Sequence, residues 1–135
     1  MPEDKKVDRH PDGDTITFEE PVEVVGNTLV VTQIHTAYAH NQHIVEVYGK
    51  VLKDAGDLIL TLQDTNGKAL QSTFANVEHV EPTDGEWLEF WHRLVEDVLP
   101  LREDIDEGVV VFELRKDGHV TRGKLLVPLK KPPTE

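Results

Sequence analysis

The sequence predicts a mainly β protein, an antiparallel sandwich or small barrel. Between residues 15 and 129, short apolar runs follow one another at fairly even intervals, with turn residues between them. Two of the turns contain Asn66-Gly67 and Asp117-Gly118, and Asn or Asp before Gly is typical of tight hairpins. Apolar and polar residues alternate in the runs beside these turns, as expected for half-buried strands.

The predicted strands, in chain order, are 15–18, 22–25, 28–34, 44–52, 58–62, 69–77, 109–114 and 120–129. The first three and the run at 69–77 are assigned because they are short and apolar, whereas 44–52 and 58–62 show clear alternation. The last two strands flank the Asp-Gly turn. Pro128 cannot donate a ladder hydrogen bond, so the final strand is expected either to lie at a sheet edge or to end its ladder at Pro128. Seven or eight strands are predicted.

One segment, 84–99, departs from this pattern. A capping box precedes it, Pro100 ends it, and its apolar residues, including Trp87, Phe90 and Trp91, fill one side of a helical wheel. Periodicity therefore favours an amphipathic helix whose apolar face packs in the core. The alternative is a strand, which would place Phe90 on one face and both tryptophans on the other. Exposed aromatics on such a strand would mark a partner-binding surface.

Length and composition predict one domain whose core is large enough to fold without disulfide bonds or a structural metal ion. The chain has 135 residues and no cysteine, which excludes disulfides, thiol catalysis and thiolate metal sites. The predicted organisation is a flexible N-terminal tether at 1–14, a single β-sandwich domain at 15–129 and a C-terminal tail at 130–135. We expect the tether because 1–14 is highly charged and has little apolar surface.

The charge of the chain argues against two classes of partner. The formal net charge is -12 and the isoelectric point is about 4.9, so phosphate backbones and anionic lipid surfaces are repelled. No apolar run approaches the roughly 20 residues that span a bilayer. We therefore expect neither nucleic-acid binding nor direct membrane insertion. The sequence does not determine the oligomeric state.

The order of features from Ile44 to Leu129 resembles the immunoglobulin-like domain of bacterial spore-germination and cell-envelope proteins. The resemblance lies in residues 45–51, in 60–64 with the turn at 66–68, in Trp87 with Phe90, in 110–113 with the turn at 116–118, and in 126–129. It implies an immunoglobulin-like sandwich of about seven strands that acts as a non-catalytic interaction or structural module. It also implies an extracytoplasmic location, tethered to membrane or cell wall, with the native signal segment missing from this chain. The implied partner is a protein or the cell wall.

The histidines suggest an alternative function. His35, His40 and His43 lie close in sequence around a predicted turn, and three imidazoles could hold a transition metal such as Zn²⁺ or Cu²⁺. An extracytoplasmic metal-binding protein is therefore the alternative hypothesis, although the spacing fits no defined metal motif. No nucleophile elbow or phosphate-binding glycine loop occurs, so we expect neither an enzyme nor a bound cofactor.

Overall fold

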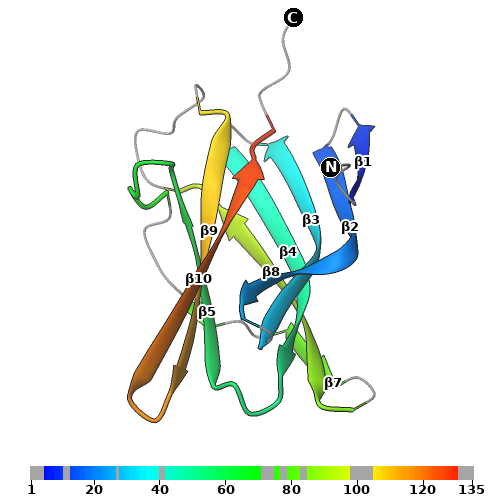
Figure 1. Cartoon of the computed structure of the whole chain (residues 1–135). Helices are drawn as coiled ribbons and strands as arrows, with labels where there is room; N and C mark the ends of the chain where they lie inside the picture. Colours follow the sequence, from blue (N-terminus) through cyan, green and yellow to red (C-terminus); the bar gives the residue numbers. More distant parts are fainter. Residues whose placement is uncertain are drawn as a thin grey trace, which may run out of the picture.

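The computed structural model consists of two antiparallel β-sheets that pack face to face (Figure 1). It describes residues 5–10, 13–26, 28–39, 42–70, 75–76, 79–82, 85–97 and 105–130. The larger sheet has the strand order β1(Lys5–His10), β2(Gly13–Val25), β3(Leu29–Ala39), β4(Gln42–Leu52), β8(Trp87–Val95), β7(His79–Pro82). The smaller sheet has the order β10(His119–Pro128), β9(Glu107–Lys116), β5(Asp57–Gln63), β6(Ala75–Asn76). The predicted mainly β sandwich is confirmed.

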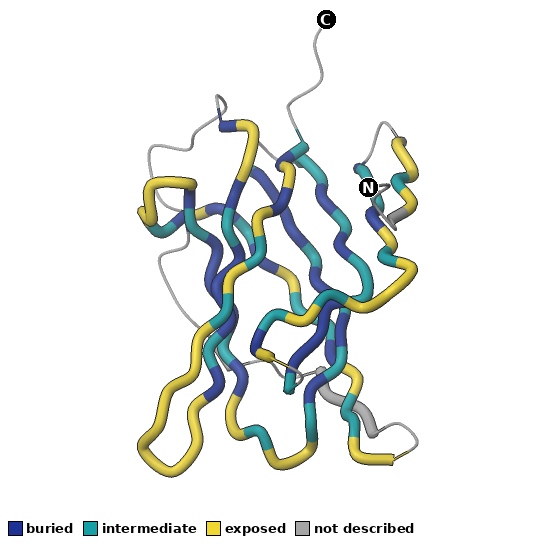
Figure 2. Tube along the Cα trace, viewed as in Figure 1, coloured by how far each residue is buried: buried dark blue, intermediate teal, exposed yellow. Residues whose placement is uncertain are grey.

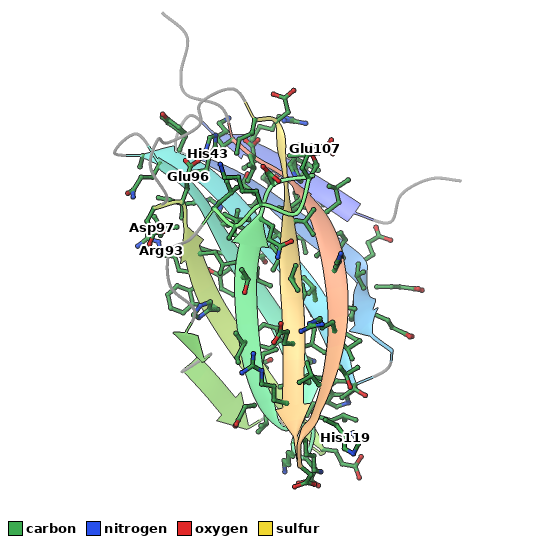
Figure 3. All side chains as sticks on the ribbon, turned by 90° about the vertical axis from the view of Figure 1, so that its left-hand side faces the viewer. His43, Arg93, Glu96, Asp97, Glu107 and His119 are labelled. Atoms are coloured by element: carbon green, nitrogen blue, oxygen red, sulfur yellow. The ribbon has the colours of Figure 1, made fainter. Side chains whose placement is uncertain are left out.

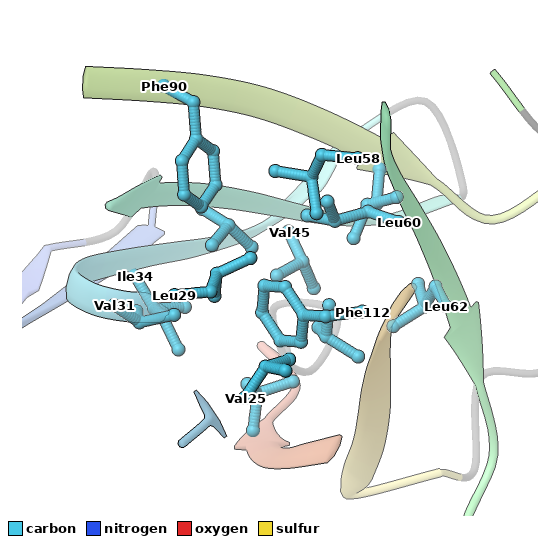
Figure 4. Close-up of a cluster of buried hydrophobic side chains, with 14 of the residues drawn as sticks. Val25, Leu29, Val31, Ile34, Val45, Leu58, Leu60, Leu62, Phe90 and Phe112 are labelled. Carbon is cyan, nitrogen blue, oxygen red and sulfur yellow. The ribbon is translucent and has the colours of Figure 1, made fainter. Parts of the chain in front are cut away.

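The core lies between the two sheets and is filled by alternate residues of their inner faces. Phe112 of β9 is fully buried and packs with Val25, Val45 and Leu62 in one apolar cluster (Figure 4). In β4 from Val45 to Leu52 the inward residues alternate with partly exposed outward ones, which is the two-residue period of a strand with one buried face (Figure 2). The transfer of such side chains out of water is the main stabilisation of the fold.

Both predicted turns are present. Asp117 and Gly118 have positive φ values of 52° and 80°, as a tight turn between β9 and β10 requires. The other turn is closed by Asp64, whose Oδ1 accepts hydrogen bonds from the backbone N–H groups of Asn66 and Lys68, each at 2.9 Å. This arrangement is an Asx turn, and its carboxylate is occupied by the backbone.

The predicted helix at 84–99 is wrong. Residues 87–95 form strand β8, which pairs with β4 on one side and with β7 on the other. Phe90 and Leu94 face the core and are buried, whereas Trp87 and Trp91 lie on the outer face. A strand with large apolar residues on both faces shows no alternation, and its residues also fit one side of a helical wheel. Pairing with β4 over nine residues decides between the two.

The strands in the described residues number ten, more than the seven or eight predicted. One addition falls within the predicted tether, because residues 5–10 form β1 and pair with β2 from Lys5↔Phe18 to His10↔Gly13. This edge strand forms without large apolar residues, because its pairing with β2 holds it, and Lys6, Asp8 and Arg9 are exposed to water. Residues 1–4 and 131–135 of the predicted tether and tail lie outside the described part.

Strand β2 changes direction along its length. Its register with β3 breaks between Thr17 and Val22, where Pro21 interrupts the ladder. The second half of β2 then packs under β10: a Cβ placed on Gly123 would lie 2.2 Å from the Val24 carbonyl oxygen. Glycine at 123 therefore permits the close approach that joins one side of the two sheets. No helix capable of spanning a bilayer is found in the described ranges.

Candidate binding surface on the outer face of the larger sheet

A groove on the outer face of the six-stranded sheet contains an aromatic pair. Tyr48 of β4 and Trp91 of β8 are directly opposite each other in register, and their ring centroids are 6.3 Å apart. Neither residue faces the core, because their neighbours Val47 and Phe90 do. We call this feature the Tyr48–Trp91 groove; its volume is about 550 Å³ and it is lined by Thr32, Gln33, Tyr48, Gly49, Lys50, Glu89, Phe90 and Trp91.

A bulge in β3 shapes one side of the groove. The β3–β4 register shifts between Val31 and Gln33, so Thr32 is the extra residue. The Thr32 hydroxyl donates a hydrogen bond to the Tyr48 carbonyl oxygen at 3.2 Å, which fixes the bulge against β4. Gln33 then lies opposite Tyr48 and lines the same groove. The bulge thus adds a residue with a neutral donor and acceptor to the groove that contains the two aromatic rings.

Charged residues of both signs border the aromatic pair. Lys50 and Glu89 are opposite each other in the β4–β8 register, one row from Tyr48 and Trp91. The pKa of Tyr48 is raised, first because burial removes water from the phenol and second because the Glu46 carboxylate is near; a side-chain hydrogen bond with Trp91 acts in the other direction. Tyr48 therefore keeps its hydroxyl proton well into alkaline pH and can donate it to a ligand.

The three predicted aromatic contact residues do not share one face. Trp87 and Trp91 lie on the outer face, where Trp87 is opposite Leu52 in register, and both are partly exposed. Phe90 is 3 % exposed and belongs to the core, although it also forms part of the groove floor. The two tryptophans therefore share the outer face, whereas Phe90 lies beneath it in the core.

The structure does not bring His35 and His43 together. His35 is opposite Glu46 in register and shares its face, and Glu46 is three residues from His43, so the two imidazoles point to opposite faces of the sheet. On the outer face, His35 Nδ1 lies 2.9 Å from the Thr15 hydroxyl. His40 lies outside the described residues. Within the described ranges, no group of three or more His, Asp or Glu side chains is arranged to hold a metal ion.

His43 instead forms a buried pair with Glu96 that the sequence did not predict. The two side chains are 0 % and 1 % exposed, and His43 Nδ1 lies 2.9 Å from Glu96 Oε1 (Figure 3). Oε1 also accepts the His43 backbone N–H at 3.3 Å. A carboxylate has no proton to donate, so in a pair with the Glu96 carboxylate Nδ1 is the donor. The Tyr38 and His43 rings are close to perpendicular, at 74°, and their centroids are 5.0 Å apart. The pair joins the start of β4 to the residue after β8, 53 positions away.

A second cleft lies at the other end of the sandwich, near His119 (Figure 3). Its volume is about 560 Å³; hairpin turns form its mouth, and Val25, Leu52 and Leu114 contribute its apolar floor. Lys116 Nζ donates a hydrogen bond to the Asp54 carbonyl oxygen at 2.6 Å across this mouth. That contact joins the β4–β5 and β9–β10 turns, so part of the polar lining is engaged in holding the fold.

Comparisons with models of protein families, with curated proteins and with solved structures give no match. The geometry of the described residues is therefore the basis for a proposal about function.

Proposed function

We propose that this chain is a non-catalytic binding module and that its ligand occupies the Tyr48–Trp91 groove. The observation that carries the proposal is the combination of two aromatic rings with amide, ammonium, carboxylate and hydroxyl groups in one groove on a sheet face. Aromatic side chains concentrate at binding surfaces, and a few placed polar groups then orient the ligand. A strand pair provides rigid support for such a site.

The ligand class that best fits this chemistry is a carbohydrate, and the bacterial cell wall is the proposed source. A sugar ring has an apolar C–H face, which packs on an aromatic ring, and hydroxyl groups, which exchange hydrogen bonds with side chains such as Gln33 and Glu89. A groove of about 550 Å³ has the size of a small-ligand site. The immunoglobulin-like identity and the location at a bacterial envelope or spore surface are parts of the proposal that depend on the sequence resemblance.

The test is a titration with soluble chitooligosaccharides and peptidoglycan fragments, followed by tryptophan fluorescence and calorimetry. We expect one-to-one binding, and we expect Trp91→Leu to weaken it at least tenfold, which is about 1.4 kcal/mol. Gln33→Ala should also weaken it, whereas Trp91→Phe should retain part of the affinity because it keeps a ring.

Thr121→Ala is the matched control, because Thr121 lines the end cleft and not the groove. Binding that is lost in Thr121→Ala but kept in Trp91→Leu would place the ligand in the end cleft and contradict the proposed site. No binding to any fragment at millimolar concentration would refute the carbohydrate proposal.

A further inference from the structure

Strand β10 is an open edge of the smaller sheet. It pairs with β9 over its whole length, from His119↔Lys116 to Pro128↔Glu107, and no other strand of the described residues pairs with it. Strand β2 reaches it near Gly123, but from the core side, since Gly123 shares a face with buried Val127. About half of the backbone N–H and C=O groups of β10 therefore point away from β9.

The outer face of β10 carries an apolar–basic–basic–apolar pattern. Val120 and Leu126 are 48 % and 55 % exposed, and they are the large hydrophobic residues that are exposed in the described part of the chain. Arg122 and Lys124 lie between them on the same face, because all four residues are two apart. Lys and Arg on an edge strand can protect it from aggregation, but protection alone does not account for the two exposed hydrophobics.

The charge of this hairpin is opposite to that of the whole chain. Residues 113–124 contain four basic and two acidic residues, in a protein with 26 acidic and 14 basic residues. One of the two acids, Glu113, is shared between Arg115 at 2.9 Å and Arg122 at 3.1 Å. An excess of positive charge therefore remains along the edge strand.

We propose that β10 is a docking edge for an extended acidic segment of a partner protein, which adds to the smaller sheet as a fifth strand. The segment would carry two acidic residues two positions apart, opposite Arg122 and Lys124, and an apolar residue two positions beyond each, opposite Val120 and Leu126. In this mode backbone hydrogen bonds provide affinity, and alternate side chains provide specificity. Opposite charges directly across two strands stabilise their pairing. This edge belongs to the smaller sheet, so the proposal is independent of the Tyr48–Trp91 groove.

The probe is a seven-residue peptide with valine at both ends, glutamate at the third and fifth positions and threonine elsewhere. Its sequence reads the same in both directions, so it matches β10 in parallel and antiparallel pairing. NMR titration of the ¹⁵N-labelled protein should give shift changes along β10 and β9, whereas the groove residues should not respond. A control peptide with its glutamates moved by one position places them on the other face and should bind at least tenfold more weakly.

Two further arms separate strand addition from simple charge attraction. A peptide with an N-methyl group at every residue keeps its charge but donates no backbone hydrogen bond from either edge, so strand addition predicts that it does not bind. Lys124→Glu keeps the Arg122–Glu113 contact and is expected to fold. It should weaken binding of the glutamate peptide at least tenfold, and a peptide in which one of the two glutamates is replaced by lysine should bind this variant better than the glutamate peptide does.

Several outcomes would overturn the proposal. These are no shift changes at millimolar peptide, undiminished binding by the N-methylated peptide, or no gain in binding to Lys124→Glu when one glutamate of the peptide is replaced by lysine. One combined result would show that the charges only protect the edge from aggregation. In that case the wild-type protein does not bind the peptide, and the double variant Arg122→Gln with Lys124→Gln self-associates in sedimentation experiments.

Discussion

Removal of the Glu96 side chain should strongly destabilise the fold. The Glu96 carboxyl group accepts hydrogen bonds from His43 Nδ1 at 2.9 Å and from the His43 backbone N–H at 3.3 Å, and both residues are fully buried. In Glu96→Ala each donor is left without a partner, at a cost of about 1–3 kcal/mol. Breaking a buried pair by removal of one partner typically costs about 3–5 kcal/mol, a large part of a stability of about 5–15 kcal/mol.

Urea unfolding followed by circular dichroism measures this loss. With a slope of about 2 kcal/mol per molar urea, a loss of about 4 kcal/mol moves the midpoint about 2 M lower. The matched control is Glu89→Ala on the same sheet, because Glu89 is exposed and its removal should change stability by less than about 0.5 kcal/mol.

The double variant His43→Leu with Glu96→Leu tests the cause. Replacement of both partners by apolar residues leaves no unpaired donor in the side chains, so the double variant should recover much of the loss. A loss below about 1 kcal/mol in Glu96→Ala would refute the reasoning, and so would a double variant that is less stable than Glu96→Ala.

Three further measurements follow from the structure. Gly123→Ala should lower the free energy of unfolding by about 1–3 kcal/mol, because its Cβ would lie 2.2 Å from the Val24 carbonyl oxygen; an unchanged melting temperature would contradict this. Hydrogen bonds first from Arg115 and then from Arg122 hold the pKa of Glu113 below its ordinary value of 4.5, so its stabilising effect is complete above that value and is lost as the pH falls through the lower folded-state pKa. The stability difference between wild type and Glu113→Gln should therefore be larger at about pH 7 than at about pH 2.5, and a constant difference would disprove the linkage. Calorimetric titration with Zn²⁺ should reveal no tight site that needs both His35 and His43, since they face opposite sides of the sheet; one-to-one binding lost in each single variant would contradict that placement.

The strands and turns that could be predicted are those where one local pattern decides the outcome. The β9–β10 hairpin is an example, because Asp117-Gly118 fits the positive φ values and the flanking residues alternate. Strand β8 could not be predicted, since both of its faces carry large apolar side chains and only its pairing with β4 excludes a helix. Strand β1 was missed because its sequence carries no apolar periodicity.

The candidate sites depend on contacts between distant parts of the chain, which a single sequence does not reveal. Trp91 could be singled out as an aromatic residue, but its position opposite Tyr48 follows from the β4–β8 register and from the bulge at Thr32. The nearby histidines in the sequence suggest a metal site for His43. Its actual partner, Glu96, is 53 residues away in the sequence. The sheet face to which His43 points is determined by the alternation of side chains along β4.

The interleaving of the strands along the chain has a consequence for how the protein folds and opens. Strands β1 to β4 pair with their neighbours in sequence, whereas β8 returns to β4 and β9 returns to β5 after long excursions through the opposite sheet. Since the segments that complete the two sheets alternate along the chain, neither sheet can be completed while the other is absent. Hydrogen exchange should therefore report one cooperative unit that contains β4, β5, β8 and β9, whose amides exchange only by global unfolding. Strand β1 pairs with β2 alone, so its amides should exchange by local fraying, many times faster and at a rate insensitive to substitutions in the core.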